Sequence, residues 1–207
     1  MILLGIGSHP DDLEYGCGGT LARFAAKGHE VHMLVMTGGE AGGDSARRRV
    51  EQVSAVKVVG AKLHWGGFHD TEVPASRTLI ESVEGYLDEI KPDMIFTHYW
   101  DDTHQDHRNL ANAVITASRY VRDVMLFEVP SSRNFSPSVY VNIGHTIAKK
   151  YSMLKMHRSQ VNKTHVPFLS ILESAKSTAI YRGHQAQVKY AEAFIAYRMR
   201  LDTAVCL

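Results

Sequence analysis

The chain contains little cysteine, no long apolar run and no excess of charge of one sign. Its 207 residues include only Cys17 and Cys206, which excludes a disulfide framework or a cysteine-built zinc ribbon. No stretch approaches the roughly 18 consecutive apolar residues of a transmembrane helix, so we expect no membrane span. Lys and Arg number 23 against 22 Asp and Glu, and the resulting charge of +1 gives no general footprint for nucleic acid. Residues 1–7 carry no basic segment of the kind that opens a secretory signal, so we expect a cytoplasmic protein.

Short apolar runs alternate with amphipathic stretches along the chain, which predicts alternating strands and helices. The expected strands lie at 2–7, 31–36, 62–65, 94–96, 124–129 and 139–143. The expected helices lie at 16–27, 45–59, 76–90 and 108–121, and the remainder is expected to be mostly helical apart from a loop at 162–167. This order predicts an α/β fold: one domain over residues 1–207, with a mostly parallel, Rossmann-like sheet and helices on both faces.

Histidine is abundant, with 12 residues, and its position relative to acidic residues is informative. His9, Asp11 and Asp12 stand together directly after the first expected strand. His9 and Asp12, three apart across a turn, can converge on one ion, and this donor pair suits zinc or another first-row divalent metal. Asp11 leaves the backbone in a different direction and can reach a water molecule on that ion. The alternative is a surface turn with a helix-capping Asp.

A second polar cluster runs from His98 to His107 and holds three histidines and three aspartates within ten residues. It follows the strand expected at 94–96 and leads into a helix. In a parallel sheet, functional loops lie beyond the carboxyl ends of the strands, so the two clusters are expected to meet. A solvated loop is the alternative, but it would not explain the density of histidine.

A catalytic zinc site uses three protein ligands and leaves a fourth position for water. His9, Asp12 and His107 would supply such a set, with His107 at the mouth of the following helix. His104 is then left free one turn away, and Asp106 can orient it by accepting a ring N–H.

These two motifs resemble those of the LmbE-like, or PIG-L, family of zinc-dependent de-N-acetylases. The family pattern His-Pro-Asp-Asp-x-Glu stands at His9 to Glu14, and the downstream His-x-Asp-His stands at His104 to His107. Flanking segments extend the resemblance along most of the chain: Gly18 to Leu21, Thr37 to Glu40, Arg48 to Glu51, His157 to Gln160 and Tyr190 to Phe194. Known members include deacetylases of mycothiol and bacillithiol synthesis.

The resemblance implies that His9, Asp12 and His107 are the metal ligands. It makes Asp11 the general base that deprotonates the zinc-activated water. By the same resemblance, His104 stabilises the tetrahedral oxyanion or protonates the leaving amine, and the sequence leaves these two roles open.

Three further roles follow from the family pattern. Asp106 would be the orienting partner of His104, Arg48 would contact the substrate, and Asp70 would accept a sugar hydroxyl. The chain also departs from relatives, since Asp102 stands where the mycothiol-type enzymes carry a mobile tyrosine.

The resemblance implies Zn²⁺ as the cofactor, with Fe²⁺ as another divalent metal that suits these donors. It implies a small N-acetylated sugar as the substrate, no nucleic-acid or membrane partner, and a homo-oligomer, since relatives often form trimers or hexamers.

Two other functions compete with a deacetylase. A nucleotide-binding oxidoreductase is suggested by two sets of glycines, Gly5 with Gly7 and Gly16 with Gly18 and Gly19. Neither set has the Gly-x-Gly-x-x-Gly spacing, and the carboxylates of Asp11 and Asp12 would repel a pyrophosphate. A catalytically silent metal-binding or sugar-binding relative would need neither Asp11 nor His104.

Overall fold

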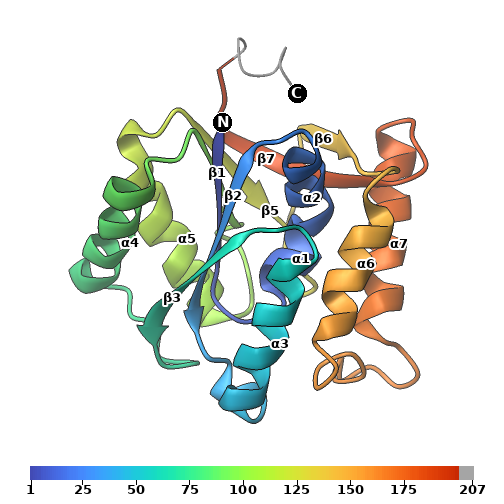
Figure 1. The fold of residues 1–207 in the computed structure, drawn as a ribbon, viewed down its shortest axis with the longest axis horizontal. Helices are drawn as coiled ribbons and strands as arrows, with labels where there is room; N and C mark the ends of the chain where they lie inside the picture. Colours follow the sequence, from blue (N-terminus) through green and yellow to red (C-terminus); the bar gives the residue numbers. More distant parts are fainter. Residues whose placement is uncertain (201–207) are drawn as a thin grey trace.

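A seven-stranded sheet forms the centre of the computed structural model, which describes residues 1–200 (Figure 1). The strand order is β3-β2-β1-β4-β5-β7-β6. The first five strands in this order are parallel, and β7 is antiparallel to both of its neighbours. The strands are β1 (Ile2–Gly7), β2 (Glu30–Thr37), β3 (Lys62–Phe68), β4 (Met94–His98), β5 (Asp123–Phe127), β6 (Val139–Asn142) and β7 (Ala191–Arg198).

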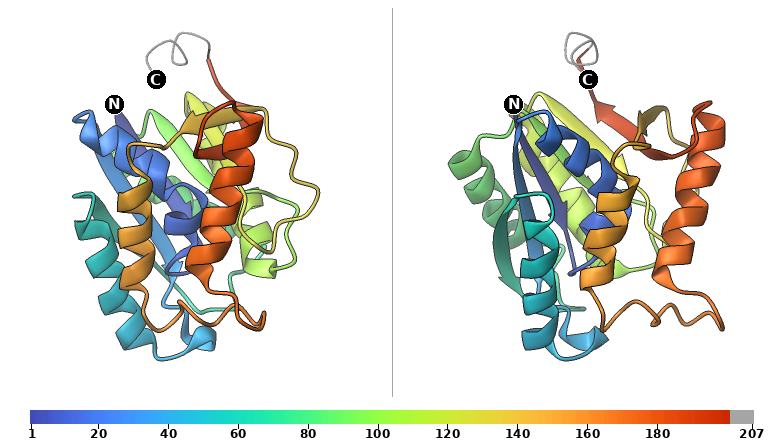
Figure 2. Two further views of the ribbon diagram at one scale, coloured as in Figure 1. Left: turned by 90° about the vertical axis from the view of Figure 1, so that its right-hand side faces the viewer. Right: turned by 45° about the vertical axis from the view of Figure 1, so that its right-hand side comes forward.

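Helices cover both faces of this sheet (Figures 1 and 2). They are α1 (Asp12–Gly16), α2 (Gly18–Ala26), α3 (Ser45–Lys57), α4 (Arg77–Ile90), α5 (Gln105–Ala117), α6 (Ile147–Met156) and α7 (Ile171–Gln185), with short 3₁₀ turns at Glu40–Gly42 and Ser118–Tyr120. Leucines of α4 and α5, Leu79 and Leu110, belong to the apolar core on one face. The other five helices contribute to the core on the opposite face, for example through Leu21 and Leu154.

The expected α/β fold with a mostly parallel sheet is therefore confirmed. The single domain expected over residues 1–207 is described as far as residue 200, and Cys206 lies outside the described residues. Within residues 1–200, none of the helices combines the length and apolar character needed to cross a bilayer.

The sheet register brings the two polar clusters together. β1 and β4 are parallel neighbours, with Ile6 opposite Thr97 near their carboxyl ends. The loop that follows β1 and the loop that follows β4 therefore leave the sheet side by side. This is the edge at which open α/β sheets bind their ligands.

The helix expected towards the end of the chain is wrong for residues 191–198, which form β7. Alanine and glutamate favour helices, but this segment inserts between β5 and β6, and Phe194 is buried with its ring 5.2 Å from that of Phe96. The burial of a whole strand outweighs a helix propensity of a few tenths of a kcal/mol per residue. The helix expected at 108–121 also begins earlier, at Gln105, which places His107 in its first turn.

A buried ion pair fastens β7 to the segment that follows the first cluster. Glu192 on β7 accepts hydrogen bonds from the backbone N–H groups of Gly19 (2.9 Å) and Thr20 (2.7 Å) at the start of α2. Lys150 of α6 pairs with Glu192 and also donates to the backbone carbonyl of Tyr15. The last strand thus fixes the position of α1 and α2, which continue the loop that carries His9.

Candidate metal centre

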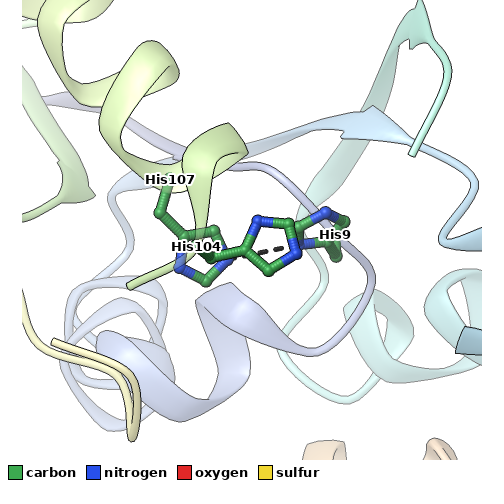
Figure 3. Close-up of side chains that lie close together, drawn as sticks. All are labelled: His9, His104 and His107. Atoms are coloured by element: carbon green, nitrogen blue, oxygen red, sulfur yellow. Dashed lines mark hydrogen bonds between the residues drawn. The ribbon is translucent and has the colours of Figure 1, made fainter. Parts of the chain in front are cut away.

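Three imidazole rings meet at the carboxyl edge of the sheet (Figure 3). His9 lies on the loop after β1, whereas His104 and His107 lie at the start of α5, after β4. The ring centroids of His9 and His104 are 4.6 Å apart, and those of His104 and His107 are 4.7 Å apart. The structure therefore brings together the two motifs that are almost 100 residues apart in the sequence.

The loop after β1 contains a strained residue. Asp11 has a φ of 96°, in the left-handed region that costs a non-glycine residue about 1–3 kcal/mol. The turn is held by the backbone N–H of His9, which donates to Oδ2 of Asp12 (2.8 Å), and by that of Asp11, which donates to Oε1 of Gln52 (3.3 Å). This turn directs the two adjacent carboxylates to different neighbours: Asp12 towards His107, and Asp11 towards Arg48.

Three donor atoms form a nearly regular triangle. Nδ1 of His9 lies 3.4 Å from Oδ2 of Asp12 and 3.2 Å from Nε2 of His107, and the last two atoms are 3.5 Å apart. Two ligands of a tetrahedral zinc ion, each about 2.0–2.1 Å from the metal, are about 3.3 Å from one another. All three residues are buried. This set of donors therefore fits a tetrahedral divalent metal ion and leaves a fourth position for a ligand outside the protein.

The charges around these donors favour a cation. Burial disfavours the charged form of His107, but Asp12 and Asp102 outweigh it and raise the pKa of His107 to about 9. The pKa of His9 is also raised well above its usual value, because hydrogen bonds to three carboxylates outweigh the effect of burial. In both cases the carboxylates stabilise positive charge at the point where a bound metal ion would supply it.

The second nitrogen of His9 contacts two carboxylates. Nε2 lies 2.9 Å from Oδ1 of Asp70 and 3.1 Å from Oδ2 of Asp106. A proton on Nε2 leaves Nδ1 with its lone pair free, which is the tautomer that a metal ligand needs. The other oxygen of Asp70 accepts from the backbone N–H of Ala41 at 3.0 Å. The structure thus places Asp70 behind His9, and its role as acceptor of a sugar hydroxyl stays a prediction.

The contact expected between the Asp106 carboxylate and His104 differs in the structure. Oδ2 of Asp106 contacts His9 and accepts from the backbone N–H of Thr71 at 2.8 Å. Instead, it is the backbone N–H of Asp106 that donates to Nδ1 of His104, at 3.2 Å. The physical reason is that His104 is the N-cap residue of α5, so its ring accepts a hydrogen bond from the first turn of its own helix.

This N-cap bond determines the tautomer of His104. Because Nδ1 accepts, the proton of the neutral ring lies on Nε2. Burial lowers the pKa of His104, and the neighbouring His9 and His107 lower it further, so the ring is neutral near pH 7. His104 therefore presents a neutral Nε2–H donor.

Asp11 has the electrostatic surroundings of a base. Its side chain is 26% exposed, and Oδ2 lies 3.7 Å from a terminal nitrogen of Arg48. Burial raises the pKa of Asp11 to about 6, although His157 and Arg48 act in the opposite direction. A carboxylate with a raised pKa accepts a proton more readily than a solvated one.

Comparison with known proteins supports the resemblance of both motifs to those of the PIG-L family. The PIG-L family model, described as GlcNAc-PI de-N-acetylase, matches residues 4–118, which is more than half of the chain. The chain belongs to the PIG-L family. A curated relative, the uncharacterized deacetylase YaiS of Escherichia coli K12, is 33% identical over 76% of this chain and 90% of its own. The diacetylchitobiose deacetylase of Thermococcus kodakarensis is 25% identical over 92% of this chain and 80% of its own.

The fold is shared with solved structures of similar size. The conserved protein TT1542 of Thermus thermophilus superposes with a TM-score of 0.86 and 26% identity, over 96% of this chain and 95% of that one. The mostly parallel sheet with helices on both faces is thus an architecture that this chain shares with known proteins.

Arg48, expected from the PIG-L pattern to contact the substrate, is buried in the structure. Its terminal nitrogens donate to the backbone carbonyls of Gly39 (2.6 Å) and Pro10 (2.8 Å). A Cβ at Gly39, where φ is 69°, would lie 2.2 Å from the guanidinium, so glycine is required there. Arg48 therefore joins the loop after β2 to the peptide that precedes Asp11, and substrate contact stays a prediction.

Replacing Arg48 with methionine tests which role dominates. Both carbonyls would lose their partner in a buried place, so we expect the free energy of unfolding to fall by about 1–3 kcal/mol. Urea denaturation measures this loss. If Arg48 instead contacts substrate alone, the variant would keep its stability and raise KM, which steady-state kinetics would detect.

Reasoning from sequence did not single out two buried residues of this PIG-L site. His98, the last residue of β4, has Nε2 3.2 Å from Oδ2 of Asp12 and stacks on His107 with centroids 4.0 Å apart. His157, at the end of α6, has Nε2 3.5 Å from Oε1 of Glu14. His98 stood inside the second cluster, and His157 stood in a family-like segment, so each carried a signal, but neither belongs to the His-Pro-Asp-Asp-x-Glu or the His-x-Asp-His motif.

Proposed function

We propose that this protein is a metal-dependent amidohydrolase that removes the N-acetyl group from an N-acetylglucosamine-type sugar or a related small conjugate. The observation that carries the proposal is the triangle of donors from His9, Asp12 and His107. The His104 ring lies 4.6 Å from that of His9, and Asp11 is next to Asp12 in the same turn. The substrate class is supported by relatives, because the names of the PIG-L family and of the Thermococcus relative both specify N-acetylglucosamine units.

Zinc is the ion we propose for the three donors, and Fe²⁺ suits the same set. Such an ion, when bound, lowers the pKa of a water molecule and polarises the acetyl oxygen. Asp11 takes the proton of the attacking water, since its turn directs it away from the ligands and its pKa is raised.

His104 is proposed to stabilise the oxyanion. Its Nε2–H can donate to the acetyl oxygen as negative charge develops there. A neutral imidazole is a poor general acid, because loss of its proton would leave an imidazolate. The proton that the amine needs on departure is then the one that Asp11 has taken from water, which balances the reaction.

The two competing functions are not favoured. A pyrophosphate would have to approach the turn after β1 where Asp11 and Asp12 stand, and like charges repel. A silent binding protein needs no carboxylate with a raised pKa next to its metal ligands, and Asp11 is such a carboxylate.

Metal removal gives the first test of the proposal. Dialysis against a chelator should abolish release of free amine and acetate from N-acetylglucosamine, diacetylchitobiose and N-acetylglucosaminyl malate, and one equivalent of zinc should restore it. The same panel identifies the acceptor. Activity that survives full removal of metal would contradict the metal-dependent mechanism.

The homo-oligomer and the cytoplasmic location expected from the sequence stay predictions. Light scattering of the purified protein and fractionation of cells check them separately.

A further inference from the structure

Asp102 lies in the loop between β4 and α5, and both oxygens of its carboxylate have partners. The function proposed above gives this residue no role. Its side chain has no exposed surface. Oδ1 lies 3.3 Å from Nδ1 of His107 and accepts from the backbone N–H of His104 at 2.8 Å. Oδ2 accepts from Oγ of Ser132 at 3.0 Å.

The contact with His107 fixes the state of that ring. A carboxylate only accepts, so Nδ1 of His107 carries the proton that points to Asp102. Nε2 of the same ring is then the nitrogen that is available to bind a metal ion in place of a proton, and it is the atom that faces Oδ2 of Asp12 (3.5 Å) and Nδ1 of His9 (3.2 Å). Asp102 thus imposes on His107 the tautomer that binds a metal, as Asp70 and Asp106 do for His9.

The same carboxylate also fixes where the following helix begins. Its bond to the N–H of His104 holds the residue immediately before α5, and the guanidinium of Arg108 donates to the Asp102 carbonyl at 2.6 Å. A backbone bridge between Asp102 and Ser132 ties this loop to the segment after β5. One buried side chain therefore sets both the orientation of His107 and the place of His104.

We propose that Asp102 is a positioning residue of the metal centre, which acts on the metal through His107 and on the oxyanion donor through the backbone of His104. The inference rests on the function proposed above, because it takes His107 as a ligand. Carboxylates behind metal-binding histidines typically contribute about 10–100-fold in metal affinity.

Two variants separate charge from hydrogen bonding. Asp102→Asn keeps an oxygen that can accept from His104 and His107 but removes the charge, whereas Asp102→Ala removes both. Asp101→Asn is the matched control, because Asp101 is the neighbouring carboxylate and contacts Asn134 on the outside of the loop. The measurement is the zinc dissociation constant of the metal-free protein by competition with a chromophoric chelator, together with the thermal midpoint of the metal-free protein.

We expect zinc affinity to fall in the order wild type, Asp102→Asn, Asp102→Ala, with about a 10–100-fold loss for alanine and no change for the control. Zinc affinity that stays at the wild-type value in both Asp102 variants would overturn the inference, whatever happens to the thermal midpoint, and would leave the deacetylase proposal intact. If zinc affinity falls in the expected order but the zinc-loaded wild-type protein releases no acetate, the proposed function is contradicted and the positioning role is supported. Wild-type protein that fails to bind zinc would contradict both.

Discussion

Replacing Asp11 with asparagine is expected to lower kcat by about 10²–10⁴-fold while the metal remains bound. Asparagine has nearly the same size but cannot accept the proton of the attacking water. It also tolerates a left-handed backbone better than most residues, so the turn at φ 96° should survive. Alanine would be a less clean replacement, because it would lose the carboxylate and also add backbone strain.

The measurement is kcat on the best acetylated substrate of the panel, together with zinc content after dialysis. Asp88→Asn serves as the control, since Asp88 is an exposed carboxylate of α4. If Asp11→Asn turns over at a near-normal rate, Asp11 is not the base. If it loses zinc as well, the donor set has been assigned wrongly.

The position of the site was predictable because it depends on sheet topology. β1 and β4 were both expected from their apolar runs, and parallel neighbours end at the same edge. His9, Asp12 and His107 could therefore be placed together from sequence alone. The distances between their donor atoms could not, because side-chain directions depend on the local turn and on the start of α5.

Three features escaped prediction, and each has a long-range cause. β7 carries a helix-like composition, and its strand conformation comes from pairing with β5 and β6. Arg48 donates to two buried carbonyls from separate loops, contacts that the sequence did not indicate, and its contact with substrate stays a prediction. Asp106 was assigned to His104, its neighbour in sequence, whereas its carboxylate contacts His9, which lies 97 residues away. Spacing along the chain reports contacts within one loop and not those between loops.

Replacing His107 with alanine is expected to remove both the metal and the activity. The remaining donors, His9 and Asp12, cannot by themselves complete a site that needs three protein ligands. The loss also leaves Asp102 and Asp12 without the imidazole that now lies 3.3 and 3.5 Å from them, so two buried carboxylates would face an empty space. We therefore expect activity to fall at least as far as in Asp11→Asn.

Comparison with His104→Ala makes this prediction specific. His104 caps α5 and presents Nε2–H, but its Nδ1 is engaged by the backbone of Asp106, so its loss should reduce kcat with zinc still bound. His184→Ala, at an exposed position of α7, should change neither quantity. Metal analysis after dialysis then separates the two site histidines, because only a ligand takes the zinc with it. If His107→Ala retained one zinc ion per chain, His107 would not be a ligand, and the assignment of His9, Asp12 and His107 as the metal site would be contradicted.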